Sequence, residues 1–147
     1  MNRGPHTILA VGLAFYILSP DIEEFTYLLL SSSIGGIAPD IDRRYRHRKL
    51  LHNIPVWITV IGLLTYILYI NLNLPQSPTI IKGLAIGVAS HLTVDSLTIR
   101  GIAPLYPIKN KHISLAKIKS NNTIFNTAGV IIGAALFTSW IYRTITP

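Results

Sequence analysis

The sequence predicts an all-α membrane protein, a polytopic helical bundle. Of its 147 residues, 50% are hydrophobic and 13% are charged, whereas about 25% are charged in an average soluble domain. Residues 53–81 and 121–142 contain no charged side chain, and each segment exceeds the roughly 20 apolar residues that cross a bilayer core. The length suits one domain, so we expect a single integral-membrane domain over residues 1–147.

Apolar runs separated by prolines and polar loops predict about five transmembrane or partly re-entrant helices. The first two, residues 7–19 and 25–38, end at Pro20 and Pro39. At 1.5 Å per residue each covers only about 20 Å of a hydrocarbon core that is roughly 30 Å thick. Longer helices are expected at residues 50–72, 79–98 and 123–143.

Small residues mark the expected packing faces of the later helices. Gly83, Gly87 and Ser90 follow one another at spacings of four and three, which allows close helix packing. The fourth helix is therefore expected to be central. Gly129 and Gly133 predict a similar face on the fifth helix, and Pro55 is tolerated in the first turns of the third.

The basic residues predict the topology. The formal net charge is +7, and ten of the thirteen basic residues lie in two loops, residues 43–49 and 100–119. Basic loops remain in the cytoplasm, so five crossings place the N-terminus inside and the C-terminus outside. This explanation accounts for the charge without nucleic acid, and no nucleic-acid partner is expected.

Histidines and aspartates fall at one membrane face when they are placed on this topology. His6 opens the first helix, Asp40 and Asp42 follow the second, His52 starts the third, and His91 and Asp95 lie in the inner half of the fourth. The chain has no cysteine, so any metal must be bound by histidine and carboxylate. The pattern predicts a metal site at the cytoplasmic edge of the bilayer.

His91 and Asp95 are four residues apart and therefore share one helix face. Ionisable residues inside a membrane helix usually face the bundle interior and have a functional role; a structural His–Asp hydrogen bond between helices is the alternative. Asp40 and Asp42 would point the same way in extended backbone, which Pro39 favours. Alone, these aspartates could simply end a helix.

The remaining cations and histidines divide between surface and site. Arg43, Arg44 and Arg46 are expected to anchor to anionic head groups. Arg48 lies between His47 and the candidate ligand His52 and is expected to bind phosphate. His112, in a basic loop without an acidic neighbour, is expected at the surface.

These motifs resemble the YdjM-like family of membrane-bound metal-dependent hydrolases, which includes LexA-regulated inner-membrane proteins. The resemblance covers most of the chain. It rests on Gly-Pro-His-Thr around His6, Pro-Asp-Ile-Asp at residues 39–42, His47-Arg48 followed by His52, and residues 91–107. The family usually has Thr-His-Ser where this chain has Leu51-His52-Asn53, so a hydroxyl-bearing group beside His52 is missing.

A more distant similarity is to zinc-dependent phospholipase C and related single-strand nucleases, helical enzymes whose ligands follow the order His, Asp, His, His-x-x-x-Asp. His6, Asp40, His52, His91 and Asp95 match that order. Those enzymes also use a later His-x-x-x-Glu, and this chain has no glutamate after Glu24. The similarity therefore implies a reduced site with one or two ions.

Together these features predict a hydrolase that acts on a phosphate ester, with a lipid phosphate as the first choice because the site lies at head-group depth. Mixed His and carboxylate ligands favour Zn²⁺, with Mn²⁺ and Fe²⁺ as alternatives. Asp42 is expected to orient or deprotonate water, and Arg48 to offset phosphoryl charge. A metal or ion transporter, or a membrane scaffold with a structural metal, remains the alternative.

Overall fold

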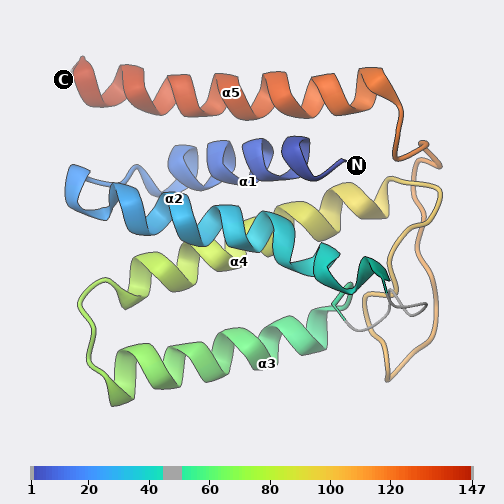
Figure 1. The fold of residues 1–147 in the computed structure, drawn as a ribbon, viewed down its shortest axis with the longest axis horizontal. Helices are drawn as coiled ribbons and strands as arrows, with labels where there is room; N and C mark the ends of the chain where they lie inside the picture. Colours follow the sequence, from blue (N-terminus) through green and yellow to red (C-terminus); the bar gives the residue numbers. More distant parts are fainter. Residues whose placement is uncertain (1, 45–50, 147) are drawn as a thin grey trace.

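In the described part of the chain, five α-helices lie side by side with their axes roughly parallel or antiparallel (Figure 1). They are α1 (Arg3–Leu18), α2 (Ile22–Ile37), α3 (Ile54–Thr65), α4 (Ser77–Ser96) and α5 (Thr123–Ile145). A 3-10 helix, η1 (Ala38–Arg44), follows α2, and a π-helical segment, η2 (Tyr66–Asn71), continues α3. This computed structural model describes residues 2–44 and 51–146, with only the backbone for residues 42–44. The described part contains no strand, which confirms the all-α class.

The first two helices are longer than the apolar runs predict, with 16 residues each. Pro5 lies in the first turn of α1, where its missing N–H costs nothing. Asp21 occupies the N-cap position of α2, and Glu23 and Glu24 lie in its first turn, where carboxylates interact favourably with the helix dipole. Polar residues at the helix starts therefore extend both helices.

Helix α4 is the central helix, as its small residues predict. It packs against α1, α2 and α3, and twelve of its twenty residues are buried. A Cβ at Gly87 would lie 2.5 Å from the carbonyl oxygen of Ser32, so only glycine allows this approach to α2. Gly133 makes the matching close approach between α5 and the backbone of Ile8 in α1.

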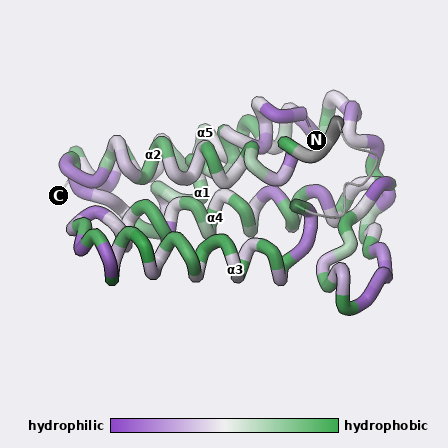
Figure 2. The backbone as a smooth tube through the Cα atoms, turned by 60° about the horizontal axis from the view of Figure 1, so that its bottom comes forward, coloured by the Kyte–Doolittle hydropathy of each residue, from purple (hydrophilic) through white to green (hydrophobic). Residues whose placement is uncertain are grey.

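Among the described residues, two helical segments are long and apolar enough to cross a membrane, Ile54–Asn71 and Thr123–Ile145. Only 6% of the first span and 22% of the second are buried inside the protein, so neither is the core helix of a soluble fold. Most of α3 has the colour of hydrophobic residues in Figure 2. The other three helices do not meet the same criterion within the described chain, and five full crossings stay a prediction.

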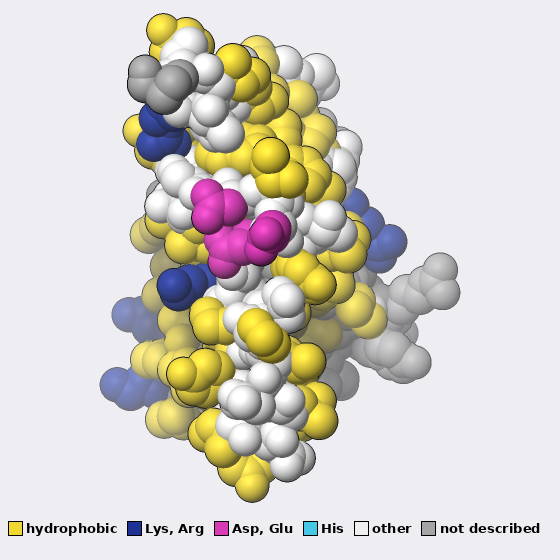
Figure 3. All heavy atoms as spheres, turned by 90° about the vertical axis from the view of Figure 1, so that its left-hand side faces the viewer, with side chains coloured by type: hydrophobic (Ala, Val, Ile, Leu, Met, Phe, Trp, Pro, Cys, Tyr) yellow, Lys and Arg dark blue, Asp and Glu magenta, His cyan; other side chains and the backbone are white. Residues whose placement is uncertain are grey.

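The two ends of the bundle differ in charge and composition. At one end, Asp21, Glu23 and Glu24 gather beside Thr144, near the end of α5 (Figure 3). At the other end lie the starts of α1, α3 and α5 and the ends of α2 and α4 (Figure 1). The histidines and aspartates of interest are at this second end.

The long connection between α4 and α5, residues 97–122, is ordered by backbone pairing without forming a sheet. Thr98 bridges Ile118, and Ile102 bridges Ile113. Gly101 has a φ of +58° and sits against the backbone of Ile113, a conformation that glycine adopts without strain. The connection is therefore anchored next to the end of α4.

Candidate metal centre

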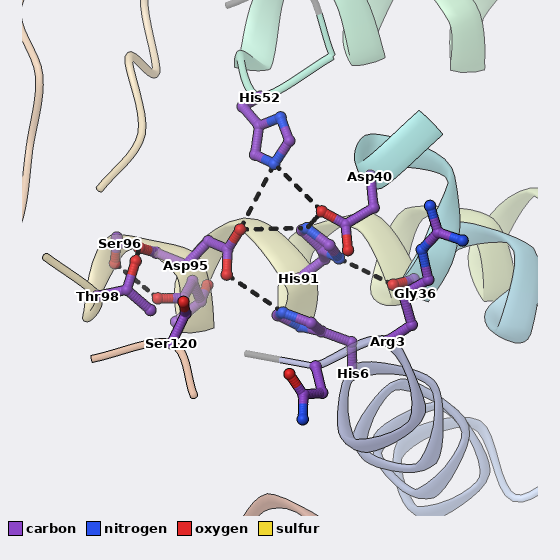
Figure 4. A network of polar contacts seen from close by, with 12 residues as sticks. Arg3, His6, Gly36, Asp40, His52, His91, Asp95, Ser96, Thr98 and Ser120 are labelled. Atoms are coloured by element: carbon purple, nitrogen blue, oxygen red, sulfur yellow. Dashed lines mark hydrogen bonds and ion pairs between the residues drawn. The ribbon is translucent and has the colours of Figure 1, made fainter. Parts of the chain in front are cut away.

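Four buried side chains from different parts of the chain offer their donor atoms to one small volume. Asp40 comes from η1, His52 from the segment before α3, and His91 and Asp95 from α4. One ligand atom from each lies within 4.8 Å of all the others. Figure 4 shows the four side chains pointing toward one another.

The separations between these donor atoms fit a shared metal ion. His52 Nε2 and His91 Nε2 lie 3.4 Å and 3.5 Å from Asp95 Oδ2, and each lies 3.8 Å from Asp40 Oδ1. Ligands about 2.0–2.1 Å from a tetrahedral zinc ion are roughly 3.3–3.4 Å apart. The Asp95 pairs are thus close to the required spacing, and the Asp40 pairs are slightly wider.

The protonation of His91 is fixed by a backbone carbonyl. His91 Nδ1 lies 2.8 Å from the carbonyl oxygen of Gly36, which can only accept, so Nδ1 carries the proton and donates. In the neutral ring Nε2 then carries a lone pair. Metal-bound histidines in proteins are oriented in this way by their second nitrogen.

The second helix supplies both Gly36 and Asp40 because its end tightens into η1. Pro39 has no N–H, so it cannot donate to the Gly36 carbonyl as a 3-10 turn would require, and His91 uses that carbonyl. The expected extended backbone at residues 40–42 is wrong, because these residues lie in η1. The alternation of side chains along extended backbone, on which the expected alignment of Asp40 and Asp42 rested, therefore does not apply to this segment.

His52 is held by its neighbours in sequence. The side chain of Asn53 caps α3 by accepting a hydrogen bond of 2.9 Å from the N–H of Val56, and asparagine is among the best N-cap residues. The N–H of Ile54 donates to the carbonyl of Pro104 at 2.8 Å. The indole N–H of Trp57 donates to the carbonyl of Leu51 at 2.7 Å. Both backbone neighbours of His52 are therefore anchored.

His6 joins the cluster through Asp95 and not through the shared volume. Its Nε2 lies 3.2 Å from Asp95 Oδ1, the carboxylate oxygen that does not face His52 and His91. Its ring also stacks on His91, with the centroids 4.0 Å apart. His6 is thus placed to orient Asp95, or to bind a second ion that Asp95 would bridge.

The sequence-based site residues fall into three groups. His6, Asp40, His52, His91 and Asp95 are buried and brought together. His112 is exposed, as expected. Arg48 and His47 lie outside the described residues, as does the side chain of Asp42.

Two residues that support the site carry no catalytic signature in the sequence. Gly36 contributes only a carbonyl. Asn126 is buried in α5, accepts a 2.8 Å hydrogen bond from the N–H of Asn2, and donates to the carbonyls of Ser120 and Asn122. It therefore ties the start of α1, and with it His6, to α5. The sequence feature that could have identified Asn126 is the presence of a polar residue within an apolar helix.

The fold and the cluster define a membrane-associated helical protein with a buried His and Asp site suited to a metal ion. The chain belongs to the YdjM inner membrane protein family, whose model matches residues 1–146. Neither a curated protein nor a solved structure shows a significant match. The more distant similarity to zinc-dependent phospholipase C thus finds no support.

Proposed function

We propose that this protein is a multi-pass membrane enzyme that uses a divalent metal ion to hydrolyse a phosphate ester, with a lipid phosphate as substrate, at the cytoplasmic face of the membrane. The proposal combines the membrane family of the chain with the geometry of its buried cluster.

One observation carries the metal assignment. His91 Nε2 is buried, has no hydrogen-bond partner among the described residues, and faces carboxylate oxygens of Asp40 and Asp95. A lone pair and two carboxylates directed into one buried space repel one another unless positive charge lies between them. A divalent ion supplies that charge and satisfies all three groups.

The donor set also constrains how the ion could act. Two imidazoles and two carboxylates suit Zn²⁺, Mn²⁺ and Fe²⁺. His52, His91 and Asp95 would hold the ion most closely, and Asp40, with its wider separations from both histidines, would be the weakest of the four ligands. An ion held in this way would supply a bound water molecule for hydrolysis if one position were left open.

A bound ion of this kind lowers the pKa of a water molecule toward neutrality and polarises a phosphoryl oxygen. The chain's own contribution is to orient the donors: Gly36 fixes the tautomer of His91, and His6 fixes the carboxylate of Asp95. Asp42 as the base and Arg48 as the phosphate-binding cation complete the proposed mechanism. Both remain expectations from the sequence.

The place of the cluster favours an interfacial enzyme over a transporter. Transport sites usually lie near the bilayer midplane between discontinuous helices, whereas this cluster lies where α1 and α3 begin and α2 and α4 end (Figure 1). A site at that depth meets lipid head groups before soluble compounds. This comparison supports a lipid phosphate as substrate.

Apolar exposure supports the multi-pass arrangement. The first two helices, α1 and α2, are not among the candidate membrane spans, but they too expose large apolar side chains. Examples are Ile17 on α1 and Leu30 and Ile34 on α2. Each of these three is more than half exposed. In water such surfaces would promote aggregation, whereas lipid would cover them.

The decisive experiment measures metal content and hydrolysis on the same preparations. The purified protein should contain a stoichiometric divalent metal by mass spectrometry and release phosphate from lipid phosphates in a chelator-sensitive reaction. His91→Ala and Asp95→Ala should lose most of the metal because each removes a donor. His112→Ala, an exposed histidine from the same chain, should retain it.

Arg48→Ala separates the hydrolase from its alternatives, since it should keep the metal and lose turnover. Equal metal content in all histidine and aspartate variants would refute the site. The transporter alternative predicts metal flux into proteoliposomes that depends on His91 and Asp95. If such flux were observed without hydrolysis of phospholipid, polyprenyl-phosphate or nucleotide substrates, we would conclude that the protein is a transporter and not an enzyme. Bound metal with neither activity would leave a structural role.

A further inference from the structure

An apolar groove of about 440 Å³ runs between α3 and α4. Trp57, Ile58 and Ile61 line it from α3, and Ala85, Ala89 and Leu92 line it from α4. No charged side chain of the described chain lines the groove. Small residues on α4 opposite large ones on α3 leave this space unfilled.

The groove opens toward the surroundings of the protein because α3 is packed loosely against the bundle. Trp57 is the one buried residue of α3, while Ile58, in the wall of the groove, is 67% exposed. Since Ile54–Asn71 is a candidate membrane span, the medium at this opening would be the lipid hydrocarbon. The contents of the groove are therefore expected to be a hydrocarbon chain.

One end of the groove meets the candidate metal centre. Ile54 and Ser96 line the groove at this end; Ile54 is two residues from His52, and Ser96 follows Asp95 directly. Val88, which also lines the groove, precedes Asp95 by seven residues, so the two lie almost in line along α4. The face of α4 that forms the groove thus borders the face that carries the ligands.

We propose that the groove between α3 and α4 binds the acyl or isoprenoid chain of a lipid phosphate whose head group reaches Asp40, His52, His91 and Asp95. The proposal rests on the proposed function for the identity of the head group. Lipid tails are as apolar as the groove itself, so the groove contributes little affinity by the hydrophobic effect. Its role is to position the chain so that the ester is held at the metal donors.

Photo-crosslinking tests the occupant without requiring turnover. The metal-containing full-length protein is placed in phosphatidylcholine vesicles with a trace of phosphatidic acid that bears a diazirine in its acyl chain. Cross-links, located by mass spectrometry, should be enriched at Ile58, Ile61 and Ala89 over Leu63, which is exposed on α3 outside the groove. Diacylglycerol with the same labelled chain should give less enrichment because it lacks the phosphate.

Larger side chains that fill the groove provide a matched comparison for the cross-linking experiment. Ala85→Phe and Ala89→Phe should reduce groove labelling several-fold while metal content stays unchanged, which also shows that the variants fold. Ala135→Phe, at an exposed alanine of α5 that does not line the groove, should label as the native protein does. If Leu63 and the groove residues were cross-linked equally, and the two phenylalanine substitutions in the groove did not change this, the cross-links would come from bulk lipid only. That result would overturn the proposal.

The two proposals fail separately. Selective groove labelling in a protein that hydrolyses no phosphate ester would refute the hydrolase and leave the lipid-chain site in place. Hydrolysis of long-chain lipid phosphates at the native rate in Ala85→Phe and Ala89→Phe would refute the groove and leave the hydrolase. Hydrolysis of a short-chain soluble ester should be unaffected by either filling substitution, because that substrate has no long chain to position.

Discussion

Three of the four residues of the candidate metal centre depend on neighbours that fix their orientation. His91 is set by the Gly36 carbonyl, His52 by the anchored residues on either side of it, and Asp95 by His6. A metal ligand that is held in this way loses little conformational entropy on binding. The supporting contacts should therefore be measurable in metal affinity.

His6→Ala distinguishes an orienting residue from a direct ligand of the shared ion. His6 contacts Asp95 Oδ1 and lies outside the four-donor volume. We expect the variant to bind one metal ion with an affinity about 10–100-fold lower, the usual effect of losing an outer-shell contact. Isothermal titration of metal into the metal-free variant measures this. Loss of one of two bound ions would instead assign His6 to a second metal.

Asn53 stands where the related family usually has a serine beside the histidine, and substitutions at Asn53 test whether its side chain replaces the serine hydroxyl in supporting His52. Because its side chain caps α3, Asn53→Ala should destabilise the protein by about 1 kcal/mol and weaken metal binding through His52. Asn53→Ser, which caps helices about as well, should preserve both properties. Unfolding in mixed detergent with and without metal gives the two quantities. Equal behaviour of the two variants would show that the cap does not support His52.

At the scale of the helices, close packing between glycines aligns the site. Gly35 and Gly87 bring α2 and α4 together, which places Gly36 and Asp40 opposite His91. Gly87→Ala should cost about 1–3 kcal/mol because its Cβ would overlap the backbone of α2. Gly62→Ala on α3 has nothing within 4 Å of the new Cβ and should be neutral or stabilising by up to about 1 kcal/mol. Unfolding measurements on both variants test this contrast.

Sequence alone predicted the number of helices and the central position of α4, because hydrophobic runs and glycine spacing determine these features locally. It did not predict η1, since the preference of the residue before Pro39 for extended backbone was overridden by continuation of α2 into a tighter helix. The place of His6 against Asp95 depends on tertiary packing of α1 on α4. The Gly36 carbonyl is a backbone group and leaves no trace in side-chain patterns.

The five candidate site residues were found together because topology, and not their spacing, brings them to one end. Only His91 and Asp95 are close in sequence. The assignment of the first two helices to opposite directions was enough to place His6 and Asp40 at the same end, and the structure agrees (Figure 1). The roles of Asp42 and Arg48 remain predictions, since neither side chain is described.

At the scale of the whole molecule, the opposite ends of the bundle predict its orientation in the membrane. The loop before α5 carries Lys117 and Lys119, and the far end carries the acidic turn at residues 21–24. Basic loops remain in the cytoplasm, so the end with the candidate metal centre should face inward.

The absence of cysteine allows this orientation to be tested by labelling single cysteines. Asn121→Cys, just before α5, and Pro75→Cys, between η2 and α4, are both at exposed positions. In intact inverted vesicles, a membrane-impermeant maleimide should label Asn121→Cys at once and Pro75→Cys only after detergent is added, while right-side-out cells should show the reverse. Labelling of both positions from the same side would rule out the five-crossing arrangement, and a complete exchange of the two patterns would place the metal centre on the outer face.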